Sequence, residues 1–272
     1  MYDPDEIALP PGWTEAPDER DIAFSPGFFP HQNLTQEALR QVMAYYYASI
    51  SQIDHQVGRL IHLLKQKGLY DQTLIIYTSD HGDYMGYRHL LLKGGHMYDP
   101  LVKVPLVMKL PGQTEAGTVR EQLVNNVDIA PTLIRAGNGT VPDGLPGHDL
   151  ISTDRAGHEM IFAEAGNEYM VRSADQKLLL TRDQKHSRFF DLQDDPLEMH
   201  DLIDEPSRHS AIHDLKDALA RWVCFDARSL PHLDDDAPVI EAANAPRPDD
   251  GHAETADAYF RERMTTGQDD QP

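Results

Sequence analysis

The sequence is poor in cysteine, in long hydrophobic runs and in positive charge. Cys224 is the single cysteine among 272 residues, so no disulfide bond can form within the chain. The cysteine count therefore does not distinguish a cytoplasmic from a periplasmic location. No apolar run approaches the roughly 18 residues of a membrane span, and no signal peptide opens the chain. The chain has 24 basic and 45 acidic residues, a formal net charge of −21. This charge argues against nucleic acid or an anionic membrane as a partner.

A long helical pattern dominates the first third of the chain. Residues 1–32 are rich in Pro, Gly and Asp and predict an extended segment that wraps a core. Asn33, with Gln36 three residues later, predicts a helix start, and Gly68 predicts its end. Between them, apolar residues recur at helical spacing and predict one broad buried face: Leu39, Val42, Met43, Tyr46, Ile50, Ile53, Val57, Leu60, Ile61 and Leu64.

Short apolar strands and a second helix follow. Strands are predicted over 73–78 and 106–110. A short helix is predicted over 128–136, with Asp128 as its cap and Gly137 at its end. Helices that alternate with apolar strands are typical of an α/β layered fold.

The pattern changes after a Gly/Pro/Asp-rich connection at 138–157. A small antiparallel sheet is predicted from three short segments: 169–172, 177–181 and 189–192. An amphipathic helix follows over 207–223. The predicted organisation is a core domain, a subdomain of sheet plus helix, and an acidic, poorly ordered tail: residues 1–155, 156–228 and 229–272.

The most informative segment joins a predicted strand to an acid and an imidazole. The apolar run ending at Thr78 continues into Ser79-Asp80-His81-Gly82-Asp83. In open α/β sheets ligands gather at the carboxyl ends of strands, so chemistry is expected at this junction. Asp80 offers oxygen and His81 nitrogen, two common metal-ligand types. The simpler alternative is a strand-end turn in which Asp80 caps a backbone amide.

Lys93 is the second candidate, in the segment Leu91-Leu92-Lys93-Gly94-Gly95-His96. Its cation suits an anionic substrate, and the apolar and glycine neighbours favour a confined position. The alternative is an ordinary solvated lysine. His89 and His96 flank it, although a lone histidine is more often a structural or surface group.

These motifs in their order resemble the sulfatase family of the alkaline-phosphatase superfamily. The resemblance covers most of residues 1–225 and corresponds to the carboxyl-terminal half of a typical member. The segments that carry it are 79–83, 92–94, 98–99, 104–107, 111–112 and 127–133, together with the helix that includes residues 47–60. It implies a sulfatase-like layered α/β sheet, truncated at the amino terminus, with a small carboxyl-terminal subdomain of antiparallel sheet plus helix.

The resemblance also implies roles for the candidate residues. Asp80 and His81 would be metal ligands, for a divalent ion that in this family is usually calcium. Lys93 would contact the sulfate group as a catalytic and substrate-binding residue. His89 and His96 are minor substrate-binding candidates. The implied substrate is a sulfate ester of a small molecule or a glycan, acted on when the missing half completes the enzyme.

The nucleophile of the family is absent. Sulfatases use a formylglycine made from the Cys of a Cys-x-Pro-x-Arg motif. Cys224 is followed by Arg228 at the right spacing, but Asp226 stands in the Pro position. The chain alone is therefore expected to be inactive. The alternatives are a phosphodiesterase or phosphonate monoester hydrolase of the same superfamily, a non-catalytic metal- or partner-binding remnant, and an unstable product that exposes apolar surface.

Overall fold

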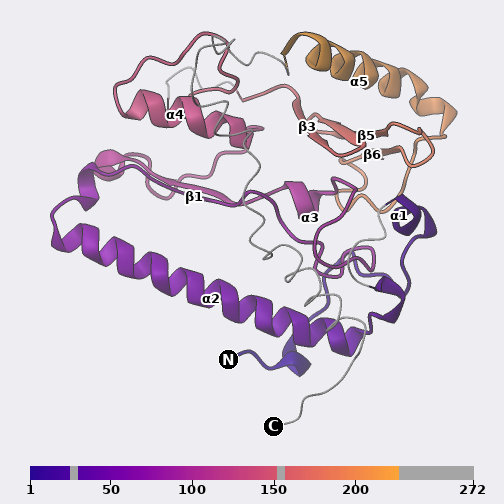
Figure 1. Cartoon of the computed structure of the whole chain (residues 1–272), viewed down its shortest axis with the longest axis horizontal. Helices are drawn as coiled ribbons and strands as arrows, with labels where there is room; N and C mark the ends of the chain where they lie inside the picture. Colours follow the sequence, from indigo (N-terminus) through magenta and orange to yellow (C-terminus); the bar gives the residue numbers. More distant parts are fainter. Residues whose placement is uncertain (25–29, 152–156, 227–272) are drawn as a thin grey trace, which may run out of the picture. The chain divides into compact units, whose positions relative to one another are not determined.

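The computed structural model describes residues 1–24, 30–151 and 157–226 (Figure 1). These residues belong to one compact unit, Met1–Arg228. The predicted domain boundary at 155/156 and the predicted tail at 229–272 lie outside the described residues, so both stay predictions. None of the helices in the described ranges combines the length and the apolar character that a bilayer crossing requires.

The long helix α2 spans Gln36–Gln66. Its N-cap is Thr35, whose hydroxyl accepts a hydrogen bond from the Ala38 amide at 3.1 Å. The prediction that Asn33 starts the helix was wrong by two residues, because Asn33 ends a separate 3₁₀ turn. Gly68 follows the helix with a φ of +66°, as expected for a glycine that ends a helix.

The predicted buried face of α2 is only partly buried. Leu39, Met43 and Ala44 are buried, whereas no residue from Tyr45 to Gln66 is. The prediction was therefore wrong for the carboxyl-terminal two-thirds of the helix. Helical spacing identifies which side chains share a face, but it does not show whether another element covers that face.

Two strands follow α2 and form a small sheet. Strand β1 spans Ile75–Thr78 and pairs antiparallel with β2, Leu106–Lys109. Within the described residues this sheet has only these two strands. Two further helices are short: α1 over Glu19–Phe24, which the extended-segment prediction missed, and α3 over Asp99–Val102.

Helix α4 spans Ile129–Ala136 and ends at Gly137 as predicted. Asp128 does not cap α4 with its side chain as expected. Its buried carboxylate instead accepts the amides of Asn125 and His148, both at 2.7 Å, and lies 2.9 Å from Nε2 of His158. Asp128 therefore joins three separate backbone segments around the start of α4.

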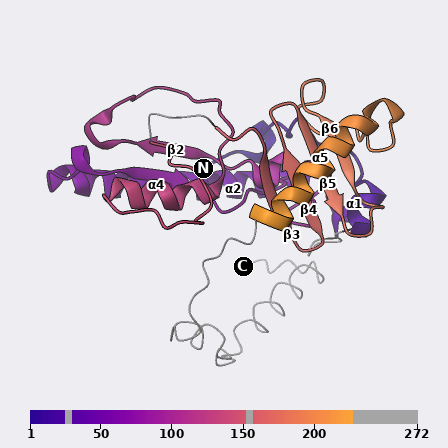
Figure 2. The ribbon, with the colours of Figure 1, turned by 90° about the horizontal axis from the view of Figure 1, so that it is seen from above.

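The predicted carboxyl-terminal sheet is confirmed and gains one strand. It contains β3 (Ile161–Ala165), β4 (Glu168–Arg172), β5 (Gln176–Thr181) and β6 (Arg188–Asp191), in that antiparallel order. Strand β3, in which three residues are half-buried and two are exposed, was not predicted. Helix α5 (His209–Arg221) lies across this sheet in Figure 2.

The two faces of this sheet bury different partners. Val171, Leu178 and Phe189 face α5 and pack against Ile212, Leu215 and Leu219. The alternate residues Met170, Leu179 and Phe190 pack on the other face, because side chains alternate along a strand. Their partners there come from the segment between β1 and β2: Tyr84, Tyr87, Leu90, Met97, Tyr98 and Leu101. The sheet therefore supports the segment that carries Lys93.

Candidate functional site

The turn after β1 presents an acid and an imidazole to solvent. One oxygen of Asp80 accepts the His81 amide at 2.9 Å and the Ser79 hydroxyl at 3.3 Å. The side chain is 85% exposed. The hydrogen bond from the His81 amide, and then the His81 ring, lower the pKa of Asp80 below its ordinary value. Asp80 therefore offers an ionised carboxylate whose second oxygen faces outward.

Gly82 holds this turn against the rest of the structure. Its amide donates to the carbonyl of Leu101 at 2.7 Å. A Cβ at this position would lie 2.0 Å from the Pro100 carbonyl oxygen, far inside van der Waals contact. Only glycine permits so close an approach, so Gly82 fixes the Asp80–His81 turn against α3.

The structure brings Lys93 to this turn. Nδ1 of His81 lies 2.8 Å from the Gly82 carbonyl, and because a carbonyl only accepts, Nδ1 is the donor; in the neutral ring Nε2 then keeps its lone pair. Nε2 in turn lies 3.5 Å from Nζ of Lys93 and 3.7 Å from the outer oxygen of Asp80. Imidazoles oriented in this way by a carbonyl are typical metal ligands.

The segment before Lys93 is strained and held in place. Four of its non-glycine residues have a positive φ: Met85 (44°), Arg88 (50°), His89 (63°) and Leu92 (63°). Such conformations cost energy and persist only when the surroundings impose them. Asp83 is one of those constraints. Burial raises the pKa of its carboxyl group, and its carboxylate accepts the Met85 amide at 2.8 Å, so Asp83 acts as a turn residue here.

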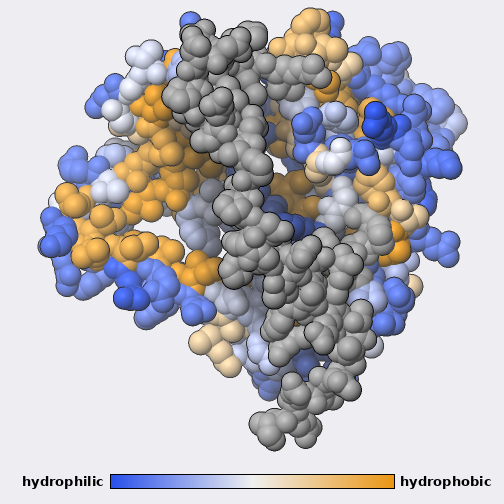
Figure 3. All heavy atoms as spheres, in the orientation of Figure 1, coloured by the Kyte–Doolittle hydropathy of each residue, from blue (hydrophilic) through white to orange (hydrophobic). Residues whose placement is uncertain are grey.

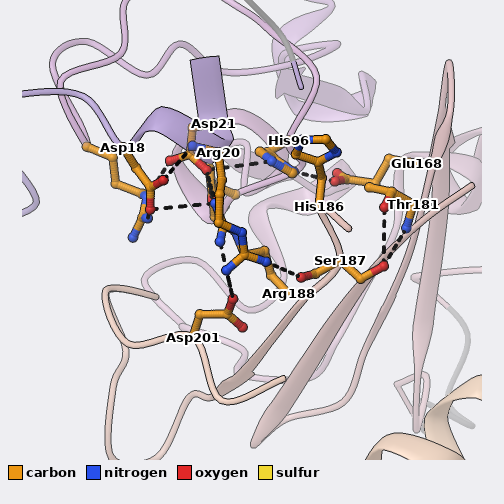
Figure 4. A network of polar contacts seen from close by, with 12 residues as sticks. Asp18, Arg20, Asp21, His96, Glu168, Thr181, His186, Ser187, Arg188 and Asp201 are labelled. Carbon is orange, nitrogen blue, oxygen red and sulfur yellow. Dashed lines mark hydrogen bonds and ion pairs between the residues drawn. The ribbon is translucent and has the colours of Figure 1, made fainter. Parts of the chain in front are cut away.

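A buried charge network fixes this segment from both sides (Figure 4). Asp21, which is fully buried, accepts from Nε of Arg88 at 2.9 Å and from Nη2 of Arg188 at 2.6 Å. Tyr98 donates its hydroxyl to the same carboxylate at 2.8 Å. The network thus joins α1, the Lys93 segment and β6. Sequence reasoning missed it, since its members are 67 to 167 residues apart along the chain.

His89 and His96 have structural surroundings. Nδ1 of His89 lies 2.7 Å from the Thr14 carbonyl oxygen, and the His89 ring contacts Trp13 at a tilt of 32°. His96 is buried, with Nδ1 2.5 Å from Glu168 and Nε2 3.6 Å from Asp21. These contacts favour positioning of the chain by both residues, and their assignment as substrate contacts stays a prediction.

Glu168 is a residue that sequence reasoning did not single out. It is buried at the start of β4. One carboxylate oxygen lies 2.5 Å from His96, and the other accepts the Met97 amide at 2.6 Å. Glu168 of β4 therefore fixes the chain at His96, three residues after Lys93. No local signal could have revealed a contact across 72 residues.

The site fits a metal ion only in part. Asp80 and His81 supply an oxygen and a nitrogen donor side by side. Across residues 1–24, 30–151 and 157–226, however, no group of three or more His, Cys, Asp or Glu side chains is arranged to hold a metal. A complete coordination sphere would need donors from elsewhere.

Comparisons with known proteins agree with this architecture. The sequence profile of the sulfatase family matches residues 14–139, and that of N-sulphoglucosamine sulphohydrolase, C-terminal, matches residues 88–223. An arylsulfatase of Clostridium perfringens is 32% identical over 200 residues, which cover 69% of this chain and 41% of that protein.

Two solved structures extend the comparison. The phosphonate monoester hydrolase of Agrobacterium radiobacter is 25% identical with a TM-score of 0.69, over 82% of this chain and 52% of that one. A protein solved in complex with its substrate D-glucosamine-2-N,6-O-disulfate is 25% identical with a TM-score of 0.62, over 68% and 41%. The predicted sulfatase-like α/β fold is confirmed, as mixed α/β with antiparallel sheets that cover part of the full fold. Because the profiles together cover most of the chain, it belongs to the sulfatase family and spans less than half the length of its arylsulfatase relative.

Proposed function

We propose that this chain supplies the metal- and anion-binding part of a metal-dependent sulfuric ester hydrolase. The observation that carries the proposal is the convergence of Asp80, His81 and Lys93 at the end of β1, where Nζ of Lys93 lies 3.5 Å from Nε2 of His81. An outward carboxylate, a ring nitrogen with a free lone pair and an ammonium group suit a cation and an anion bound side by side.

Each residue has a distinct part in this proposal. Asp80 and His81 hold a divalent ion, and oxygen donors favour calcium. When bound, such an ion stabilises negative charge that develops on a sulfate oxygen. Lys93 neutralises a second oxygen of the same group.

The residues that carry this proposal bind the substrate and do not supply the nucleophile, since no Cys-x-Pro-x-Arg motif occurs in the printed sequence. The single cysteine, Cys224, is exposed in a π-helical turn that follows α5. The substrate class is a sulfate ester on a small molecule or a glycan. The glycan reading is supported by the relative solved with a sulfated glucosamine.

The test is a two-ligand titration followed by NMR of the His81 ring and the Lys93 side chain. We expect calcium to shift His81 and sulfate to shift Lys93. Asp80→Ala should abolish the calcium response, and Lys93→Ala should weaken sulfate binding at least about tenfold, as the loss of a charged contact implies. Asp54→Ala and Lys103→Ala, which alter exposed charges elsewhere, are the controls. Wild-type responses in the site variants would contradict the proposal.

A phosphonate monoester hydrolase is the second candidate, and the structural likeness to that enzyme favours it. The same cation and lysine would accept a phosphonate oxygen. Repeating the titration with methylphosphonate discriminates the two. Binding that is at least ten times tighter for methylphosphonate than for sulfate, and that Lys93→Ala removes, would favour this candidate.

A further inference from the structure

One asparagine in the printed sequence is followed directly by glycine, in the dipeptide Asn138-Gly139. Both residues are exposed and lie just after α4. Asparagine is among the thermally labile residues, and a following glycine increases that lability because it has no Cβ to shield its backbone nitrogen. The dipeptide is therefore a candidate for spontaneous loss of the side-chain amide.

The reaction at such a dipeptide is deamidation. The backbone nitrogen of Gly139 attacks Cγ of Asn138, a new C–N bond forms, and the bond from Cγ to Nδ2 breaks. Nδ2 leaves as ammonia, with the proton that the Gly139 nitrogen gives up. Water then opens the cyclic imide at either carbonyl and yields aspartate or isoaspartate. The reaction consumes only water, but it requires the Gly139 nitrogen to be free to attack.

In the structure this nitrogen is engaged. The amide of Gly139 donates to the carbonyl of Ile134 at 2.8 Å, and the amide of Asn138 donates to the carbonyl of Arg135 at 2.9 Å. Asn138 has a φ of +60°, in the left-handed region that asparagine enters more readily than most residues. Together these features form the Schellman motif that ends many helices. The closed motif therefore protects the Gly139 nitrogen from the reaction.

The end of α4 is held less firmly than its body. Pro131 and Thr132 are buried, and Figure 3 shows hydrophobic side chains gathered over the region of α4 and β1. Every residue from 135 to 140 is exposed. Exposed ends of elements open at a much lower free energy than packed segments. The motif can therefore open while the rest of the chain stays folded.

We propose that Asn138 is a deamidation site whose reaction is controlled by local opening of the end of α4. The closed motif preserves Asn138, and each opening frees the Gly139 nitrogen. The isoaspartate product lengthens the main chain by a methylene group. It also adds a negative charge at the carboxyl-terminal end of a helix, where the macrodipole disfavours it. The motif does not re-form around this product, so the modification leaves the end of α4 open.

The first test follows deamidation of the full chain at mildly alkaline pH by peptide mapping with mass spectrometry. We expect Asn138 to react at least about tenfold faster in guanidinium chloride than in the folded chain, because denaturation removes the hydrogen bond to Gly139. Asn138→Gln confirms the assignment of the peptide. Equal rates in the two states, or no reaction of Asn138 in denaturant, would overturn the proposal.

A matched pair of variants tests whether the opening is local. Ala136→Gly, at the last residue of α4, weakens the helix beside the motif and should speed the reaction in the folded chain about two- to fivefold. Ala48→Gly makes the same change inside α2 and should leave the rate unchanged. Equal acceleration by both variants would assign the reaction to global unfolding. That result, or no acceleration by Ala136→Gly, would contradict control by the end of α4.

The last test examines the product. Ion exchange separates the deamidated chain by its added negative charge, and hydrogen exchange then compares its amides with those of the unmodified chain. We expect the isoaspartate form to lose protection at the Gly139 amide and to keep it in β4–β6. Retained protection at Gly139 would show that the motif re-forms around the product, against the proposal.

Discussion

Asp21 is the residue on which the buried charge network depends. Its carboxylate has no solvent exposure and meets Arg88, Arg188 and Tyr98 at once. Removing one partner from a buried ion pair leaves the other charges buried without a counter-charge or water. The resulting loss of folding stability usually exceeds the net contribution of the intact pair.

The Asp21→Asn substitution should therefore lower the free energy of unfolding by about 3–5 kcal/mol. Asp18→Asn, at a partly exposed carboxylate that also meets Arg88, should cost much less. Urea unfolding followed by circular dichroism measures both. Equal losses would show that burial of Asp21 does not set the cost.

The same carboxylate gives a pH dependence with a definite sign. Burial by itself would raise the pKa of Asp21, but Arg88 and Arg188 outweigh it and hold the pKa below 3.8. A group with a lowered pKa in the folded state stabilises above its ordinary pKa and loses that contribution as the pH falls through the folded value. The stability of the Asp21→Asn variant should therefore depend less steeply on pH below about 3.8 than that of the wild type.

At the scale of elements, local patterns predicted most of the secondary structure. The apolar spacing of α2, the β-branched run of β1 and the short apolar runs of β4–β6 each reflect contacts between near neighbours in sequence. Strand β3, Ile161–Ala165, was not among the predicted elements. The exposure of α2 from Tyr45 onward escaped because apolar spacing shows which side chains share a face and does not show whether another element covers that face.

The positions of the candidate residues were predictable only in part. The sequence places Asp80 and His81 directly after a strand, and in the structure Nζ of Lys93 lies 3.5 Å from Nε2 of His81. The supports of that geometry were not predictable. The close approach of Gly82 to Pro100 and the grip of Glu168 on His96 arise between segments that only the folded chain brings together.

A glycine inside α2 and a glycine just after it should respond in opposite directions to alanine. Gly58 lies inside the helix, and a Cβ there meets no atom within 4 Å, so Gly58→Ala should raise the free energy of unfolding by about 0.5–1 kcal/mol. Gly68 has a φ of +66°, so Gly68→Ala should lower it by about 1 kcal/mol. Thermal melts of the two variants provide the comparison. A gain from Gly68→Ala would contradict the left-handed end of α2.

At the scale of the whole molecule, negative charge is in large excess. With 45 acidic and 24 basic residues, mutual repulsion opposes the compact state. Salt screens that repulsion, and it also weakens exposed ion pairs, each of which contributes at most about 1 kcal/mol. With a net charge of −21, we expect the screening of repulsion to outweigh the weakening of ion pairs, so that salt stabilises the folded chain.

Added sodium chloride should therefore raise the melting temperature by a few degrees between about 0.02 and 0.5 M, as the screening length falls below about 10 Å. Differential scanning fluorimetry is sufficient for this measurement. Sucrose at matched osmolality serves as the control for general exclusion effects. A melting temperature that falls with salt would mean that attractive ion pairs dominate.

The bare two-thirds of α2 has a consequence for how long the chain persists in a cell. Proteases and chaperones act on apolar segments that folding leaves accessible, and the abundance of a marginal protein follows their action. Among the described residues, those of α2 from Tyr45 onward form such a segment, since none of them is buried. We therefore expect the cellular half-life of this protein to follow the exposure of that helix more closely than the free energy of unfolding.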